Sequence, residues 1–471
     1  MSSFSALNGA YTSLNAQRIA LEAVGQNISN VNTPGYTRQR VNLEAITGGT
    51  QPTMTGTARG LGVRVTSVER LGDLFAETKL RTQTSSASRL GAVAAGWRLV
   101  ETSVKEPSEK GLAAGLDTFF TSWQDVANRP DDTAAKAVLL GNANSLVAAV
   151  ADSYRAAESQ WVATRDQASA IADDVNTTAV AVADLNARIR DAQVSGVPAN
   201  ELIDQRGVLL TDLASLVGGE VRARADGTID VMVGGNALVR GDQTYAVAVH
   251  GTSALEGLAG ASSMPDDGWG AHAGPPRLVW AASGDTAGAT GGRLSGLVDT
   301  LATDGPFAGM AASYDALVTT IATEVNALHS SLPGHDGVTR DFFSFAPGLN
   351  PALGLRVAVT DIAHLTTGVP GEVEGSIATA ISKLSGARDL WGGAVVDLGV
   401  STRAAVRRAE AAEHTRGIAE GQLLSHTAVD LDEESVNLVM YQRAYEAAAR
   451  VLTTVDEMLD TLINRTGVVG R

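Results

Sequence analysis

The sequence predicts a mainly α-helical protein with a β-rich insert, in which the N- and C-terminal helices pair as coiled-coil arms. Three observations lead to this fold class. Apolar residues repeat every seven positions at both ends, helical periodicity fills most of the middle, and a two-residue period begins near residue 221. With 471 residues and 44% hydrophobic content, the chain is long enough for several packed domains.

We expect three regions along the chain. The terminal coiled-coil region, with an extended segment, covers 1–83 and 400–471. A helical-bundle middle domain covers 84–217 and 297–399, and an outward β-rich insert domain covers 218–296. The first two regions are each built from distant parts of the sequence, so these parts must meet in space.

The N-terminal helix is predicted from a heptad pattern. Its seam consists of Leu7, Leu14, Leu21 and Ile28 at one position and Tyr11, Val24 and Val31 at the other. Serines near the start offer N-caps, and the helix should stop near Asn32-Thr33-Pro34-Gly35, where proline cannot continue it. Residues 36–80 lack a strong helical period and are expected to be extended.

The C-terminal helix shows a stronger heptad pattern. One seam position holds Leu424, Leu431, Leu438, Tyr445, Leu452 and Leu459, and the other holds Tyr441, Ala448, Val455 and Leu462. Asp430 is the predicted N-cap, with Glu433 three residues later as in a capping box. Two narrow apolar seams favour pairing of these helices with each other or with neighbouring subunits; the alternative is two surface helices on a single core.

The middle of the chain is predicted as helices followed by short strands. Helices are expected at Ala87–Val104, Leu112–Asn128, Thr133–Ser195, Ala199–Leu216, Gly305–Ser330 and Glu372–Leu384, with a bend or break left open within Thr133–Ser195. Strands are expected at Val221–Ala225, Ile229–Val233, Tyr245–His250 and Arg277–Trp280. The first two strands flank Asp226-Gly227, which is a strong signal for a hairpin turn.

Composition excludes several classes of protein. The 36 basic and 52 acidic residues give a net charge of −16, which disfavours binding to nucleic acid or anionic lipid. The absence of cysteine excludes disulfides, thiolate catalysis and zinc–thiolate sites. The N-terminus lacks the features of a secretory signal, and no uninterrupted apolar run of about 18 residues predicts membrane insertion.

No catalytic motif is found in the sequence, so we expect no enzyme activity, no cofactor and no metal site. His329 and His335-Asp336 lie near a Pro-Gly turn and are expected in a solvated loop. Asp430, Asp432, Glu433 and Glu434 lack the glycine and the terminal glutamate of a calcium loop, so helix capping explains them better.

Two terminal segments resemble the bacterial flagellar axial proteins. The first is the string GQNISNVNTPGYTRQR at residues 25–40, and the second is VDLDEESVNL at 429–438 followed by YQRAY at 441–445. Within this group, the segments 183–186, 201–206 and 291–297 and the sequence Asp341-Phe342-Phe343 resemble the hook-associated protein 1 family rather than hook protein. Gln26, Gly207 and the tail Asn464–Arg471 depart from the family pattern.

The resemblance implies a structural subunit at the hook–filament junction of the flagellum, needed for filament assembly and exported by the type III pathway without a cleaved signal. Implied partners are copies of itself in a ring, hook protein, the second junction protein, and an export chaperone at the C-terminal helix. The expected assembly interface comprises Leu7, Tyr11, Leu14, Leu21, Ile28, Asn30, Asn32, Pro34, Gly35, Tyr36, Leu431, Leu438, Tyr445, Leu452, Val455, Leu459 and Leu462. The alternatives are another axial subunit, such as hook or distal rod, or an extracellular enzyme carried in the insert.

Overall fold

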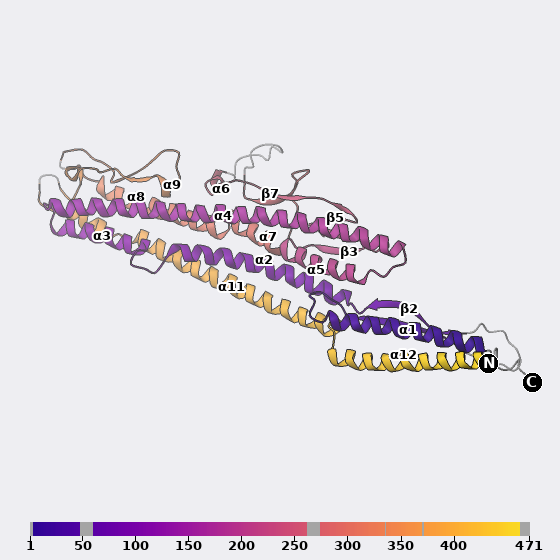
Figure 1. The fold of residues 1–471 in the computed structure, drawn as a ribbon. Coiled ribbons are helices and arrows are strands. Elements are labelled where there is room, and N and C mark those ends of the chain that lie inside the picture. Colours follow the sequence, from indigo (N-terminus) through magenta and orange to yellow (C-terminus); the bar gives the residue numbers. More distant parts are fainter. Residues whose placement is uncertain (1–2, 48–59, 261–273, 335, 370–371, 462–471) are drawn as a thin grey trace, which may run out of the picture.

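The computed structural model describes residues 3–47, 60–260, 274–334, 336–369 and 372–461. The molecule is elongated, with a thick helical bundle at one end and a slender pair of terminal helices at the other (Figure 1). The described chain begins and ends in this slender part. The predicted fold class, mainly α with a smaller β component and long terminal helices, is confirmed.

The slender part consists of two helices and one β-hairpin. Helix α1 (Ser3–Ser29) packs on α12 (Leu431–Asp460) and also on the antiparallel strands β1 (Gln39–Thr47) and β2 (Gly60–Arg70). The hairpin lies very close to α1, because a Cβ added at Gly62 would meet the Thr12 hydroxyl at 2.2 Å. Gly62 also has a φ of +113°, which favours glycine.

The prediction of an extended segment over 36–80 is correct for the hairpin but wrong after residue 73. Helix α2 (Leu74–Val104) begins there, well before the predicted start at Ala87. Its N-cap is Asp73, whose carboxylate accepts hydrogen bonds from the backbone amides of Phe75 and Ala76. The first turns of α2 are rich in threonine and serine, so their apolar period is too weak to predict this part of the helix.

The bundle is organised around one very long helix. Helix α4 (Thr133–Val194) is continuous over 62 residues and packs with α3 (Leu112–Asn128), α5 (Asn200–Leu216), α7 (Gly292–Leu301) and α8 (Pro306–His329). The bundle core contains most of the large buried side chains of the molecule, including Phe119, Trp123, Tyr154, Trp161, Phe307, Tyr314, Phe342 and Trp391. Among the described residues, no buried member of this core belongs to α1 or α12.

Helix α11 (Gly386–Thr427), which follows the short α10 (Ser376–Ser382), is the main element that the sequence did not predict. It packs along α2, with Lys79 Nζ donating to Gln422 Oε1 at 2.8 Å. The expected domain boundaries at 83/84 and 399/400 lie inside α2 and α11. The heptad step from Leu424 to Leu431 crosses a break between helices, because Ala428 is extended, with φ −68° and ψ 150°.

The β-rich part lies against α4, and β8 also contacts α7. A four-stranded antiparallel sheet has the order β3 (Glu220–Ala223), β4 (Ile229–Val233), β5 (Asn236–Arg240), β6 (Gln243–Thr244), and a second sheet pairs β7 (Val247–His250) with β8 (Arg277–Trp280). The predicted turn at Asp226-Gly227 is present, and Gly227 has a φ of +75°. The short helix α6 (Gly257–Gly260) follows β7. A third sheet, β9 (Phe343–Phe345) with β10 (Leu355–Val357), flanks α9 (Pro351–Gly354) near the 3-10 helix η2 (Ile362–His364).

Candidate assembly interface

The apolar heptad of α12 forms one side of the terminal pair. Its buried or half-buried members are Leu438, Tyr441, Tyr445, Ala448, Leu452, Val455 and Leu459. Leu431, the first residue of the helix, is 47% exposed and therefore lies outside this seam. Leu462 falls outside the described residues. The seven members share the side of the helix that packs on α1.

The heptad leucines of α1 lie at the border of its buried face. Leu7, Leu14, Leu21 and Ile28 are half-buried, whereas the fully buried stripe consists of Ala10, Ala16, Ala20, Ala23 and Val24. Small residues are required there because α1 packs on both α12 and the hairpin. Tyr11 is 63% exposed, so the prediction that it packs in the seam is wrong within one chain.

The loop after α1 ends the helix and turns the chain toward the bundle. Asn30 caps this end, since its Nδ2 donates to the Gln26 carbonyl at 3.0 Å and its Oδ1 accepts from Thr33. Asn32 and Pro34 are exposed. Gly35 has a φ of +78°, and a Cβ there would meet Val208 of α5 at 2.2 Å. Any side chain at this glycine would push the loop away from the bundle.

Asn27 is the centre of a buried hydrogen-bond network that sequence reasoning missed. Its Oδ1 accepts from the Tyr36 hydroxyl and from the Gln39 amide, both at 2.9 Å. Its Nδ2 donates to the Gln39 carbonyl at 2.9 Å and to Glu434 Oε2 at 3.1 Å. Burial and the charge of Asp204 raise the pKa of Tyr36 to about 12. Every hydrogen-bonding group of the Asn27 amide is therefore engaged.

The same network joins the two ends of the chain through ion pairs. Arg38 Nε lies 2.7 Å from Glu434 Oε1, and Glu434 is only 1% exposed. Arg38 Nη2 lies 2.8 Å from Glu433, and this hydrogen bond lowers the pKa of Glu433. The acidic start of α12 was predicted as helix capping, and Asp430 does cap it. Glu433 and Glu434 serve instead as partners of Arg38.

Asp204 of α5 fixes the loop to the bundle. Its carboxylate accepts from the Thr37 amide at 3.0 Å and pairs with Arg70, which also pairs with Glu77 of α2 at 2.8 Å. A cleft of about 430 Å³ lies beside these groups, lined in part by Pro34 and Tyr36. Arg70 and Asp204 could not be paired from sequence, since 134 residues separate them. Asp204 does lie in the segment 201–206 that carried the family resemblance.

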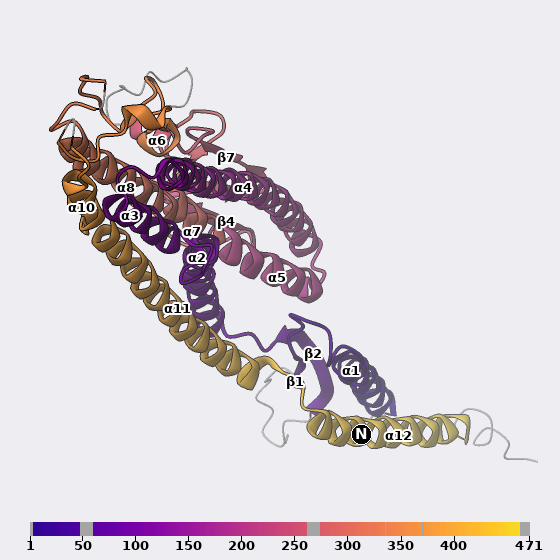
Figure 2. The ribbon, with the colours of Figure 1, turned by 90° about the vertical axis from the view of Figure 1, so that its left-hand side faces the viewer.

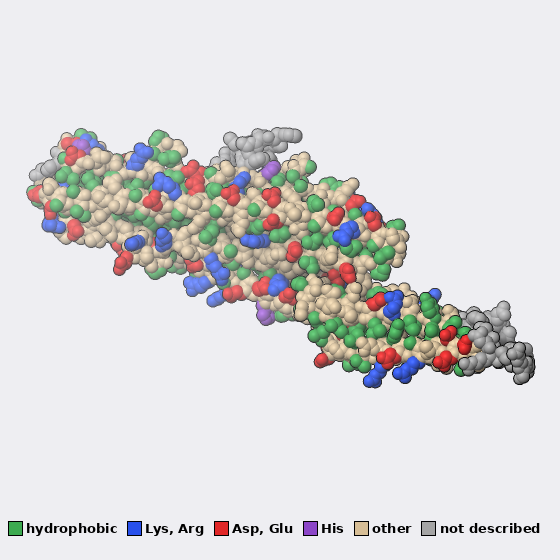
Figure 3. Space-filling model, viewed as in Figure 1, with side chains coloured by type: hydrophobic (Ala, Val, Ile, Leu, Met, Phe, Trp, Pro, Cys, Tyr) green, Lys and Arg blue, Asp and Glu red, His purple; other side chains and the backbone are tan. Residues whose placement is uncertain are grey.

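A second apolar stripe runs along α12, away from its seam with α1. It consists of Val436, Met440, Ala447, Val451 and Met458, all exposed, at spacings that place them on one side of a helix. Val436 is 68% exposed and Met458 is 59% exposed. The terminal pair also carries a band of hydrophobic side chains in Figure 3. The slender part of the molecule therefore exposes apolar surface that the described residues do not cover.

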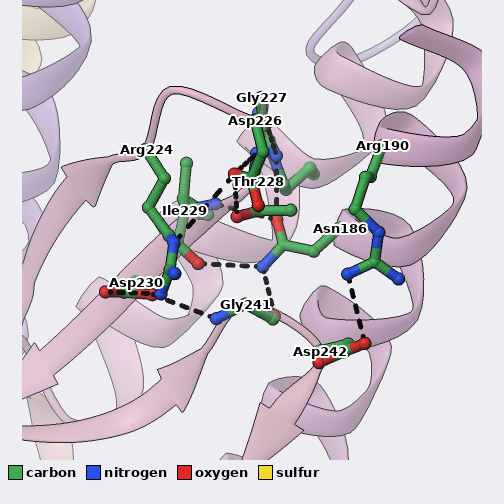
Figure 4. Close-up of polar contacts among 11 residues, drawn as sticks. Asn186, Arg190, Arg224, Asp226, Gly227, Thr228, Ile229, Asp230, Gly241 and Asp242 are labelled. Atoms are coloured by element: carbon green, nitrogen blue, oxygen red, sulfur yellow. Dashed lines mark hydrogen bonds and ion pairs between the residues drawn. The ribbon is translucent and has the colours of Figure 1, made fainter. Parts of the chain in front are cut away.

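A second polar network attaches the four-stranded sheet to α4 (Figure 4). Asn186, fully buried, donates to the carbonyls of Ile229 and Gly241 at 2.9 and 2.7 Å, and its Oδ1 accepts from the Ile229 amide. Arg206 of α5 donates to Asn186 Oδ1 at 2.8 Å and to the Gly227 carbonyl. Burial lowers the pKa of Arg206 to about 10. These contacts give a physical reason for Asn186 and Arg206, the last residues of the segments 183–186 and 201–206 that resemble the hook-associated protein 1 family.

The histidines and acids do not form a metal centre among the described residues. The expectation of a solvated loop is wrong for His329, which is fully buried at the end of α8. Its Nδ1 lies 2.8 Å from the Arg340 carbonyl, and its Nε2 accepts from the Thr366 amide at 3.1 Å. Burial lowers the pKa of His329. His335 falls outside the described residues.

Helix α4 is long and apolar enough to cross a membrane by length and composition alone, the one such helix in the part of the chain that the structure describes. A third of its most apolar window is buried inside the protein. The long helix supplies much of the bundle core, including Tyr154 and Trp161. That the chain does not insert into membranes stays a prediction.

Comparison with known proteins places the chain among flagellar proteins along most of its length. The family described as the helical domain of the flagellar hook-associated protein FlgK matches residues 98–343. Two further families match the ends: the flagellar basal body rod protein at 7–37 and the C-terminal part of the basal body rod proteins FlgEFG at 421–465.

Individual relatives agree with the family matches. The flagellar hook-associated protein 1 of Bacillus subtilis is 29% identical over the whole of both chains. That of Escherichia coli is 32% identical over 48% of this chain and 41% of its own length. The solved structure of the hook junction protein FlgK from Burkholderia pseudomallei covers 57% of this chain and 47% of its own, at 22% identity and a TM-score of 0.45.

The family match spans more than half of the chain, and the terminal matches fall on the helices that form the slender pair. The network of Asn27, Arg38 and Glu434 joins the two terminal segments. The chain therefore belongs to the flagellar hook-associated protein 1 family, structural subunits of the bacterial flagellum at the junction between hook and filament, where they associate with other axial components.

Proposed function

We propose that the terminal pair is the part of the molecule that enters the axial structure, and that copies of the chain surround the axis as a ring. The observation that carries this proposal is the second apolar stripe of α12, exposed from Val436 to Met458. One side of α12 packs on α1 of the same chain, and no described residue covers the second stripe, which leaves it for a neighbouring copy.

The energy of this contact comes from apolar burial. Full burial of a valine or methionine contributes roughly 1.5–3 kcal/mol relative to leaving it exposed. Four such side chains, at positions 436, 440, 451 and 458, are available on each copy. Covering them on every copy offsets the entropy lost when the copies and their long side chains are ordered. Leu462 aside, the interface residues expected from the sequence belong to α1, to α12 or to the loop that follows α1.

The ring has two ends, which give it two further partners. We propose that hook protein contacts one end and the second junction protein the other, as the family position between hook and filament suggests. Before export, an export chaperone would cover α12, because an amphipathic helix with two apolar stripes is prone to premature association. We also propose that the chain acts without catalysis, since its relatives are structural proteins.

The proposal is tested by changing one exposed residue of the second stripe. In a strain that lacks the native protein, the full-length Met440→Asp variant should be exported but not incorporated. The Thr453→Asp variant is the matched control, because Thr453 is equally part of α12 but lies on its polar side. Electron microscopy should show hooks without filaments for the first variant and normal filaments for the second. Normal filaments with both variants would contradict the proposal.

A further inference from the structure

The terminal pair leaves open how the thick bundles of neighbouring copies face one another. A ring of identical copies joined head to tail needs two different surfaces on each copy, which must complement each other. Resting on the ring proposed above, we infer that the outer face of α4 on one copy contacts the outer face of α11 on the next. Figures 1 and 2 both show these two helices on opposite sides of the bundle.

The surface on α4 is acidic. Asp173 and Asp174 are exposed and have no ion-pair partner among the described residues. Asp166 lies two turns before them and Asp184 about three turns after, and both are exposed on the same helix. No lysine or arginine occurs between residues 166 and 187. Asp166 lies 3.9 Å from Arg165 Nη1, whereas Asp173, Asp174 and Asp184 have no ion pair with any described residue. This stretch of α4 therefore presents unpaired negative charge.

The surface on α11 is basic. Arg407 and Arg408 are exposed and likewise lack an ion-pair partner in the described part of the chain. Arg403, one turn earlier, is exposed and donates to the carbonyl of Gly399. The nearest acidic residue along the helix, Glu410, leaves an excess of two positive charges. Two surfaces with opposite unpaired charges on opposite sides of one molecule fit a head-to-tail contact between copies.

The two charged surfaces also lie at the same level along the bundle. Ser88 of α2 and Ser215 of α5 are 3.0 Å apart and mark one level. Helices α4 and α5 are antiparallel, so nine residues on from the contact of Arg206 with Asn186, Ser215 of α5 lies opposite position 177 of α4. In the same way, nine residues on from the contact of Lys79 with Gln422, Ser88 of α2 lies opposite position 413 of α11.

Both charged pairs lie about one helical turn from that level and on the same side of it, since 177 − 174 = 3 residues and 413 − 408 = 5 residues. A rotation about a ring axis brings surfaces of equal level face to face. An exposed apolar residue follows each charged pair toward the terminal helices: Val180, 57% exposed, on α4 and Ile418, 49% exposed, on α11. The contact would therefore combine charge with some apolar burial.

Cysteine cross-linking tests the contact directly, because the chain contains no native cysteine. Thr177→Cys and Ala411→Cys introduce thiols at exposed positions one turn from each charged pair. Oxidation of flagella assembled from the double variant should give a ladder of dimers, trimers and larger species. Each single variant should remain monomeric, since a head-to-tail contact brings together one thiol of each kind. A double variant without a ladder, or single variants that form dimers equally well, would overturn the inference.

Charge reversal supplies the second test. Asp173→Arg with Asp174→Arg, or Arg407→Asp with Arg408→Asp, should lower the cross-linking yield about tenfold or more through like-charge repulsion. The chain that carries all four changes should recover most of the yield. Absence of recovery would contradict pairing between these residues.

A probe on the second stripe of α12 separates this contact from the ring itself. A photoreactive cross-linker attached to Val451→Cys, which is 50% exposed in the wild-type chain, captures whichever neighbouring copy covers that stripe. If this probe links neighbouring copies and the α4–α11 thiol pair does not, the ring stands and the contact inferred here is wrong. If neither links copies, both the ring and the contact fail.

Discussion

The terminal pair and the bundle are both helical, yet they bury side chains in very different ways. In the 30 residues of α12 only Glu434 and Val455 are buried, whereas α4 places tryptophan, tyrosine and a row of aliphatic residues in a continuous core. The bundle therefore holds itself together, while the pair depends on half-buried seams and one polar network. A subunit that must join its neighbours needs such a division, because surface used for assembly cannot also be buried within the monomer.

The largest difference that we expect between the terminal pair and the bundle is in the hydrogen exchange of the isolated monomer. Helices without a packed core open at low cost, whereas a bundle core opens only near the global unfolding free energy. We expect amides in Leu7–Ile28 and Leu438–Leu459 to exchange at least about a thousandfold faster than those in Thr133–Ala192. Limited proteolysis should likewise trim both ends first. Equal protection in the two regions would mean that the terminal pair is stable in the monomer and does not depend on assembly for its order.

A pair of core substitutions separates stability from assembly. Trp161→Ala removes a fully buried side chain of the bundle and should lower its unfolding free energy by about 3–5 kcal/mol. Leu452→Asp alters a half-buried seam residue and should leave bundle unfolding unchanged while blocking incorporation into flagella. No tryptophan occurs in the sequence of α1 or α12, so tryptophan fluorescence during urea unfolding does not report on the terminal helices themselves. A large loss of bundle stability in Leu452→Asp would show that the two regions unfold together.

The joint, by which we mean the polar network of Asn27, Arg38 and Glu434, should have an intermediate effect when it is disrupted. Glu434→Ala leaves Arg38 and the Asn27 amide without their buried partner. Arg38 keeps Glu433 and some contact with solvent, so we expect a loss of about 2 kcal/mol, less than for a fully buried pair. Hydrogen exchange at the start of α12 should report it. Glu434→Gln is the control, since its amide retains the shape and one hydrogen bond, and it should lose less than the alanine variant.

Sequence alone predicted the parts of this fold that are set by local pattern. The limits of α3, α4 and β8 and the N-cap at Asp430 follow from periodicity and capping chemistry. Helix α11 escaped prediction because its glycines and alternating charges hide its apolar stripe. The joint escaped for another reason: Asn27, Arg38 and Glu434 are polar residues whose contacts span about 400 positions of sequence, a distance over which no local pattern operates.

The smallest expected effect concerns pH, and it also distinguishes the two regions. His329 has a pKa below its ordinary value of 6.5 because it is buried, and its Nε2 accepts from the Thr366 amide. The unfolded chain therefore binds a proton more readily, so bundle stability is full above pH 6.5 and falls as the pH drops toward the folded pKa. The nearby charge of Asp341 opposes this shift, which keeps the effect modest.

At the joint the sensitive group is a carboxylate, and its pH window is lower. The hydrogen bond from Arg38 lowers the pKa of Glu433 below 4.5, so its contribution is present above pH 4.5 and is lost only below that value. Between pH 6.5 and 5, urea unfolding followed by tryptophan fluorescence should thus show weakening of the bundle, while hydrogen exchange at the start of α12 stays constant once corrected for the intrinsic pH dependence of exchange. His329→Gln should flatten the slope of bundle stability with pH in that window, because a neutral amide replaces the titrating ring beside Trp123 and Phe342. A slope that persists in this variant would assign the pH dependence to other groups of the bundle.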